Sequence, residues 1–190
     1  MKSEHDSLKG NCVYKWVVLP KGKKELPCKW LFNIKRKVDG SVDRYKARIV
    51  AGGRRQKEGI DFKDTFAPVA KFASLRVLLT MVALEDLEGE QADIVTAFLY
   101  GELDEVVYMK VPEGVAPEIG DEYVDTDGSV KIFTEDNLSN GAVVNIVWLL
   151  CKSLYGLKQS PRCFYRKLDG VLVAKGYMRV VCDYGVWRLL

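Results

Sequence analysis

The chain has few of the side chains that most often bind metals or form covalent cross-links. Among its 190 residues there is a single histidine, and the five cysteines are widely scattered, with no pair at metal-ligand spacing. This pattern argues against a zinc site and against a disulfide-stabilised secreted fold. We therefore expect reduced thiols and an intracellular, non-secreted protein, in either the cytoplasm or the nucleus. The cysteines are Cys12, Cys28, Cys151, Cys163 and Cys182.

A long apolar run is also missing. No stretch approaches the roughly 20 residues that span a bilayer, and the charged segment from Met1 to Asp6 lacks the apolar core of a signal peptide. We expect no membrane partner. Hydrophobic residues (48%) and charged residues (29%) occur in ordinary proportions for a globular protein, and the length suffices for one core, or for one domain and part of another.

The small net charge of +3 conceals an uneven distribution along the chain. Residues 1–60 carry 16 Lys or Arg against 6 Asp or Glu, residues 61–150 carry 5 against 18, and residues 151–190 carry 8 against 2. Basic segments attract phosphates, and an acidic segment can hold metal ions. Chance segregation of solvated faces explains the same pattern equally well, so charge alone identifies no function.

The basic N-terminal third contains a hairpin signal. Residues 29–37 predict a strand, Asp39-Gly40 a tight turn, and residues 44–51 the return strand. Residues 59–68 then read as an irregular loop.

Alternation along the return strand places Arg44, Lys46 and Arg48 on one face. Three cations at this spacing can meet a triphosphate or a nucleic acid backbone, and Arg36 and Lys37 would extend the surface. The alternative is a solvated outer face of an edge hairpin, where lysine also discourages aggregation.

The acidic middle begins with a predicted helix. Ser74 is the expected N-cap, leucine and valine recur at helical spacing after it, and Gly89 is the expected end. A short strand carrying Asp93 is expected to follow directly, and residues 106–111 predict another. Residues 113–145 are acidic and rich in glycine, which predicts a long loop or an inserted hairpin rather than core.

The C-terminal part resumes with a predicted buried strand at residues 146–150. Ser160-Pro161 is a helix start, a capping hydroxyl followed by proline at the first helical position, and Lys175-Gly176 fits its end. A further strand is expected to begin near Val180.

Several residues are candidates for chemistry, each with a plainer explanation. Asp93 interrupts an apolar segment, where a carboxylate usually needs a metal or a cation; a strand-end or capping role is the alternative. Phe98 is either a ligand contact or core. Gly156, after Tyr155, permits close backbone approach, and Lys158 precedes a helix N-terminus that favours anions, although a well-capped loop looks the same. The spacing of a P-loop is absent both from Tyr155 to Pro161 and from Gly52-Gly53-Arg54-Arg55.

The order and wording of these segments together resemble the reverse transcriptase of copia-type retrotransposons. The matching segments are Lys29-Trp30-Leu31-Phe32, Asp39-Gly40, Tyr45 to Ala51, Gly59 to Phe62, Thr65 to Val69, Gln91 to Gly101 and Lys152 to Arg162. They cover nearly the whole chain outside residues 113–145.

The resemblance implies an α+β fold, the fingers and part of the palm of a right-hand polymerase, with an antiparallel sheet and packed helices. Residues 1–75 would be the fingers-like basic β region, residues 76–112 the palm strand and helix with the first catalytic Asp, residues 113–145 an acidic loop or insertion, and residues 146–190 the region of the palm helix. The implied partners are an RNA or DNA template-primer, deoxynucleotides and other segments of a Pol polyprotein.

The resemblance also assigns roles to single residues. Lys46 and Arg48 would face the triphosphate of the incoming nucleotide, and Asp93 would be the first metal-binding catalytic carboxylate, in one cleft with them. Phe98 would reject a 2′-hydroxyl, and Tyr155-Gly156 would lie against the nascent base pair. Nucleic acid contacts would come from Arg36, Lys37, Arg44 and Lys158. The implied cofactor is Mg²⁺, as a two-ion site.

The family's remaining catalytic carboxylates lie in a Tyr-Val-Asp-Asp hairpin after the palm helix, and this sequence has none there. Tyr123-Val124-Asp125 is a near match, but it lies upstream and lacks the second Asp. We therefore expect an amino-terminal fragment of an RNA-directed DNA polymerase, inactive alone. The alternatives are a non-catalytic nucleic-acid-binding remnant and an inert, poorly folded product.

Overall fold

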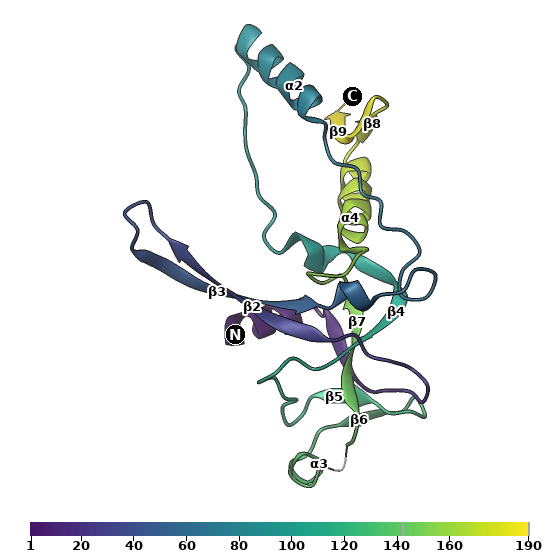
Figure 1. The fold of residues 1–190 in the computed structure, drawn as a ribbon. Helices are drawn as coiled ribbons and strands as arrows, with labels where there is room; N and C mark the ends of the chain where they lie inside the picture. The colour runs from purple at the N-terminus through teal and green to yellow at the C-terminus, as the bar shows by residue number, and fades with distance from the viewer. Residues whose placement is uncertain (142, 190) are drawn as a thin grey trace.

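The computed structural model describes residues 1–141 and 143–189. Its centre is a five-stranded sheet with the strand order β4-β7-β1-β5-β6. Two separate two-stranded hairpins, β2-β3 and β8-β9, lie outside this sheet, and β8-β9 lies near α2 at the far end of α4 (Figure 1). The sheet strands are β1 (Tyr14–Val18), β4 (Glu102–Met109), β5 (Glu122–Val124), β6 (Val130–Ile132) and β7 (Ile146–Lys152).

The central sheet is mixed. Strand β7 pairs antiparallel with both β1 and β4, and Trp16 lies opposite Trp148. Strand β1 pairs in parallel with β5, through Trp16 and Tyr123. The fold is therefore mixed α and β, as expected, whereas the expectation of a purely antiparallel sheet is wrong. The predicted buried strand near residue 146 is confirmed, because β7 has neighbours on both sides.

Two strands from the region of residues 113–145 join this sheet. The predicted hairpin is present as β5-β6, followed by the short helix α3 (Glu135–Ser139). The expectation that the region lies outside the core is wrong, because Tyr123 and Phe133 are both buried, with ring centroids 4.6 Å apart. Asp125, in the near match to the catalytic hairpin, instead pairs with Lys131 at 2.5 Å, which lowers the pKa of its carboxyl.

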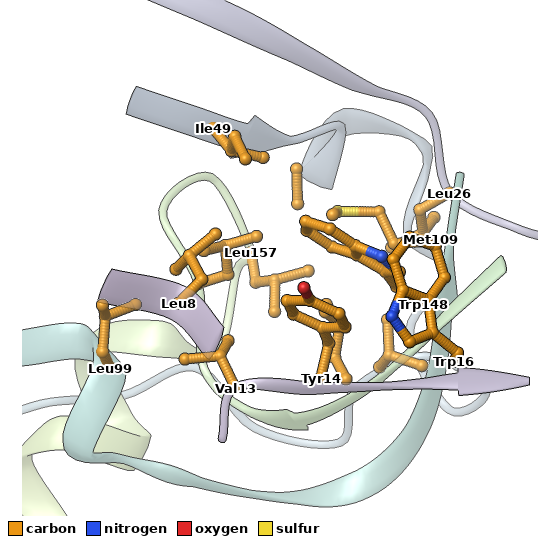
Figure 2. Packing of buried hydrophobic residues seen from close by; sticks show 14 of the residues in the cluster. Leu8, Val13, Tyr14, Trp16, Leu26, Ile49, Leu99, Met109, Trp148 and Leu157 are labelled. Atoms are coloured by element: carbon orange, nitrogen blue, oxygen red, sulfur yellow. The ribbon is translucent and has the colours of Figure 1, made fainter. Parts of the chain in front are cut away.

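The core lies between the sheet and the N-terminal helix α1 (Lys2–Gly10). Figure 2 shows Leu8 and Val13 facing the aromatic side chains of the sheet. The rings of Tyr14 and Trp148 stack at 3.7 Å, and Trp16 meets Trp148 edge-on at 5.8 Å. These large apolar surfaces, removed from water, are the main source of stability in this part of the chain.

The predicted basic hairpin is confirmed as β2 (Cys28–Arg36) and β3 (Val42–Ala51). Its turn contains Gly40 at a φ of 85°, a conformation that glycine adopts readily. The hairpin projects from the body of the molecule, and only its end near Ile49 enters the core (Figures 1 and 2).

Helix α2 (Phe72–Leu84) stands apart from the sheet (Figure 1). The predicted start and end are both wrong. The N-cap is Lys71, whose backbone N–H donates to Asp183 at 2.8 Å, and the C-cap is Glu85. Sequence spacing indicated a helix with one buried stripe, yet none of its residues is buried.

The predicted strand around Asp93 is also wrong. Residues 87–94 have no regular structure, and the chain then forms the 3₁₀ turn η2 (Ala97–Tyr100). A strand exists only where a second strand satisfies its N–H and C=O groups. In the part of the chain that the structure describes, no strand pairs with residues 91–96.

The remaining elements are the 3₁₀ turn η1 (Gly53–Arg55), helix α4 (Ser160–Ala174) and the hairpin of β8 (Tyr177–Val180) and β9 (Asp183–Leu189). Helix α4 begins one residue differently from the prediction: Gln159 is the N-cap, and the Ser160 hydroxyl donates to the Leu154 carbonyl instead of capping. Gly176, with a φ of 87°, follows the C-cap as expected.

The cysteines are free. No helix within residues 1–141 and 143–189 is long and apolar enough to cross a membrane.

Candidate nucleotide-binding site

The end of strand β3 meets the loop before helix α4. The backbone N–H of Ala51 donates to the Tyr155 carbonyl at 2.8 Å. Gly156 follows at a φ of 92°, and a Cβ atom there would lie 2.3 Å from the Ala51 carbonyl oxygen. Only glycine fits both the backbone conformation and the space, so the hairpin and the loop are held in close contact.

Three of the predicted site residues come together at this junction. The guanidinium carbon of Arg48 lies 5.3 Å from the centre of the Tyr155 ring. The Tyr155 ring in turn meets Phe98 edge-on, at 5.5 Å and 77°. These residues come from β3, the loop before α4, and η2, which are far apart in the sequence. We call Arg48, Tyr155 and Phe98 the cation–aromatic cluster.

Arg48 keeps an unused donor in this cluster. Its Nε atom is buried and has no hydrogen-bond partner among the described residues. A buried N–H of a cation that lacks an acceptor is costly. The guanidinium is thus held over an aromatic face, with its Nε closed off from solvent and the residue as a whole only partly buried.

Helix α1 brings a carboxylate to the same strand. Glu4 accepts a hydrogen bond from the Ile49 backbone N–H at 3.3 Å. Burial raises the pKa of the Glu4 carboxyl, against the opposing effects of that bond and of the Arg48 and Lys46 cations. The candidate phosphate-facing cations therefore have an internal counter-charge nearby.

Residues that sequence reasoning missed hold the cluster in place. The Ser153 hydroxyl donates to the Phe98 carbonyl, and the Ser153 N–H donates to the Gly101 carbonyl at 2.7 Å. A Cβ atom on Gly101 would lie 2.7 Å from the Cys163 backbone, so α4 packs directly on this glycine. The signal was present in the matching segments, which contain Ser153 and Gly101, but only the fold joins them.

A second missed pair is Gln56 and Gln159, both buried. The Gln56 side-chain amide donates to that of Gln159 at 2.9 Å, and Gln159 donates to the Asp61 carbonyl at 2.9 Å. Lys158 is bound here: its backbone N–H donates to the Gln56 side chain at 2.8 Å, and its ammonium lies 4.7 Å from the Phe62 ring centre. A nucleic acid contact for Lys158 stays a prediction.

The basic face of the hairpin has the geometry that alternation predicts. Lys35 pairs across the strands with Arg44, Asn33 with Lys46, and Leu31 with Arg48. Arg44 is exposed, with a side-chain accessibility of 69%. Arg36 and Lys37 lie at the tip of the hairpin, where Arg36 donates to the Gly40 carbonyl at 3.0 Å.

Asp93 does not join the cluster through any contact in the described structure. It is exposed in the irregular segment before η2, and its neighbour Ile94 lines a hollow with Phe164 and Leu168 of α4. Among residues 1–141 and 143–189, no group of three His, Cys, Asp or Glu side chains can hold a metal ion. The described residues do not by themselves fit a two-ion Mg²⁺ site.

Comparison with known proteins identifies relatives along almost the whole chain. The family described as "Reverse transcriptase (RNA-dependent DNA polymerase)" matches residues 11–189. The chain is 42% identical over 183 residues to the retrovirus-related Pol polyprotein from transposon TNT 1-94 of Nicotiana tabacum, covering 96% of this chain and 12% of that protein.

Two relatives from Arabidopsis thaliana show the same relationship. The Pol polyproteins from transposons RE1 and RE2 are 36% and 35% identical over 162 residues, covering 85% of this chain and 10% of each relative. The chain thus spans only about a tenth of the length of these curated relatives. No solved structure matches it.

Proposed function

The chain belongs to the reverse transcriptase family of copia-type retrotransposon Pol polyproteins, and we propose that it binds the incoming nucleotide and the template-primer within such an enzyme. In this proposal residues 1–75 are the fingers of a right-hand polymerase, residues 76–112 and 146–190 belong to the palm, and residues 113–145 are an insertion. The parent reaction is attack of a primer 3′-oxygen on the α-phosphorus of a deoxynucleotide, with release of pyrophosphate.

The cation–aromatic cluster carries this proposal. Arg48 is only partly buried and stands over Tyr155, so its cation is already positioned for a phosphate. Lys46, two residues earlier on the same face, adds a second cation for the triphosphate. The charge that develops on phosphate oxygens is then offset by groups already in place.

The aromatic members of the cluster would recognise the sugar and the base. The Phe98 ring lies edge-on to Tyr155, and the Ser153 hydroxyl holds the Phe98 backbone carbonyl, so the ring can exclude a 2′-hydroxyl by bulk. Tyr155 and the close-packed Gly156 would form the surface beside the nascent base pair.

The basic face would bind the nucleic acid backbone. Lys35 lies directly opposite Arg44, and like charges at paired positions destabilise a hairpin unless an anion separates them. Phosphates supply that anion, and Arg36 and Lys37 extend the surface to the tip. This part of the proposal predicts affinity that falls as salt rises.

Metal chemistry needs more carboxylates than the described residues bring together. Asp93 is the single candidate ligand by family. We propose that it works with carboxylates from another segment of the Pol polyprotein, and that exposed α2 and residues 91–96 pack against that segment. No reaction step is therefore assigned to this chain alone.

Nucleotide binding tests the cluster directly. We expect Arg48→Ala to weaken binding of a fluorescent deoxynucleoside triphosphate roughly 10- to 150-fold, because a charge-assisted hydrogen bond contributes roughly 1.5–3 kcal/mol. Arg54→Ala is the matched control, since Arg54 is exposed in η1 and lies outside the cluster. Equal affinity of the Arg48 variant and the parent chain would contradict the proposal.

A second candidate function is nucleic acid binding without catalysis, favoured by the exposed basic face and by the lone Asp93. Primer extension separates the two. We expect no extension of a primed template by the isolated chain, and oligonucleotide binding that weakens in an Arg44, Lys46, Arg48 triple-alanine variant. Robust extension that Asp93→Asn abolishes would show that the chain assembles a complete metal site by itself.

A further inference from the structure

The β2-β3 hairpin has a second face, opposite the cations, and it is aromatic. The pairing register places Trp30 opposite Ile49, Phe32 opposite Ala47, and Ile34 opposite Tyr45. Side chains directly opposite one another in an antiparallel pair lie on the same side of the sheet. One face is thus basic and the other apolar and aromatic, on strands that are neighbours in space for their whole length.

Only the inner end of this aromatic face is covered. Ile49 is fully buried against the core, whereas Phe32 is 64% and Tyr45 78% exposed. The rings of Trp30 and Phe32 are nearly parallel, with centroids 6.1 Å apart and an interplanar angle of 13°. The hairpin projects from the body of the molecule in Figure 1, and Met1 borders the hollow beside Phe32 and Tyr45.

A shallow hollow lies beside this face. Phe32, Ile34 and Tyr45 line it with Met1, and Lys46, whose side chain belongs to the basic face, borders it. Aromatic rings beside a lysine, on an exposed strand, are the two components with which proteins hold unpaired bases and their phosphates. We propose that Phe32 and Tyr45 form a stacking surface for the bases of single-stranded nucleic acid, a site that deepens the proposed function and rests on it.

Charge argues for this occupant over a second copy of the chain. Residues 28–51 contain seven Lys or Arg and two Asp. Both acids are engaged locally: Asp39 accepts from Ser41 within the turn at 2.6 Å, and Asp43 lies 3.8 Å from Arg44. Two such hairpins repel each other, whereas a polyphosphate backbone is attracted.

The two faces of the hairpin therefore bind different parts of the nucleic acid. Phosphates are neutralised by the cations of one face, and bases that cross the edge of the hairpin rest on the rings of the other. Stacking is tolerant of sequence because every base has a π-face. The surface is predicted to favour unpaired over duplex nucleic acid, since paired bases are already stacked on each other.

The test compares the affinity for an oligonucleotide that has bases with the affinity for one that has only the sugar-phosphate backbone. A labelled oligothymidylate and an abasic oligonucleotide of equal length are titrated with the parent chain, with a Phe32→Ala, Tyr45→Ala double variant, and with Phe66→Ala as control. Phe66 is a 70% exposed phenylalanine in the segment before α2. Fluorescence anisotropy gives the affinities, and melting curves verify that all chains are equally folded.

We expect the parent chain to prefer the oligothymidylate, and the double variant to lose that preference by roughly 5- to 150-fold while binding the abasic strand unchanged. Phe32→Trp should retain it. Equal parent affinities for the two strands, an equal loss of both in the double variant, or a change only in self-association by sedimentation would each overturn the proposal. The proposed nucleotide site is tested separately, because it is contradicted only if Arg48→Ala and the parent chain bind the triphosphate with equal affinity.

Discussion

The central sheet and helix α2 are both strongly apolar, yet they differ completely in what surrounds them. In the sheet, Trp148 is 0% exposed and lies between strands, helix α1 and other aromatic rings. In α2, Leu79 is 58% and Leu84 is 80% exposed, and Arg76 is the only charged residue of the helix. A helix that is apolar on most sides is typical of one enclosed by protein.

The central sheet is thus stabilised by contacts within the chain, whereas α2 lacks such contacts. The sheet buries its apolar surface within residues of this chain, whereas α2 and residues 87–94 present theirs to solvent. Exposed apolar surface of this extent marks an interaction surface. The contrast supports our proposal that further polyprotein segments cover α2 and the chain around Asp93.

The largest effect is expected in the core. Trp148→Ala should lower the free energy of unfolding by about 3–5 kcal/mol, because it removes a fully buried aromatic side chain and leaves a cavity. Leu79→Ala, its counterpart in α2, should cost less than about 1 kcal/mol because little surface is removed from contact. Urea unfolding measures both. Similar losses for the two variants would show that α2 is packed in solution.

The junction between the sheet body and the hairpin is the next most sensitive point. Gly156→Ala should destabilise the chain by about 2 kcal/mol or more, because the backbone has a positive φ and the new Cβ meets the Ala51 carbonyl. Gly10→Ala is the control, since a Cβ there meets nothing within 4 Å. The Gly156 variant should also lose triphosphate affinity, and retained affinity would contradict the placement of Tyr155 beside the nucleotide.

The smallest effect on stability is expected at Asp183, which binds the start of α2. Hydrogen bonds from Ser74, the Lys71 N–H and the Gly185 N–H lower the pKa of Asp183 below its ordinary 3.8. These bonds therefore stabilise the fold above the ordinary pKa, and their contribution is lost as the pH falls through the lowered value. We expect faster amide exchange in α2, but not in β7, under strongly acidic conditions and in Asp183→Asn at neutral pH.

Equal protection of α2 in Asp183→Asn and in the parent chain would show that this carboxylate does not hold the helix start. Exchange that rose equally in β7 would instead indicate global destabilisation and remove the distinction between the two regions.

The sequence by itself determined the β2-β3 hairpin, the buried strand β7, helix α4 and the family, because each depends on local periodicity, turn chemistry or an ordered set of motifs. It could not determine the cation–aromatic cluster, the Gln56–Gln159 pair or the parallel pairing of β1 with β5, which join residues far apart in the chain. The tertiary structure also decided that Asp93 does not lie in a strand. A segment with a strand-like sequence forms a strand only when a neighbouring strand pairs with its N–H and C=O groups, and the described residues provide no such neighbour for residues 91–96.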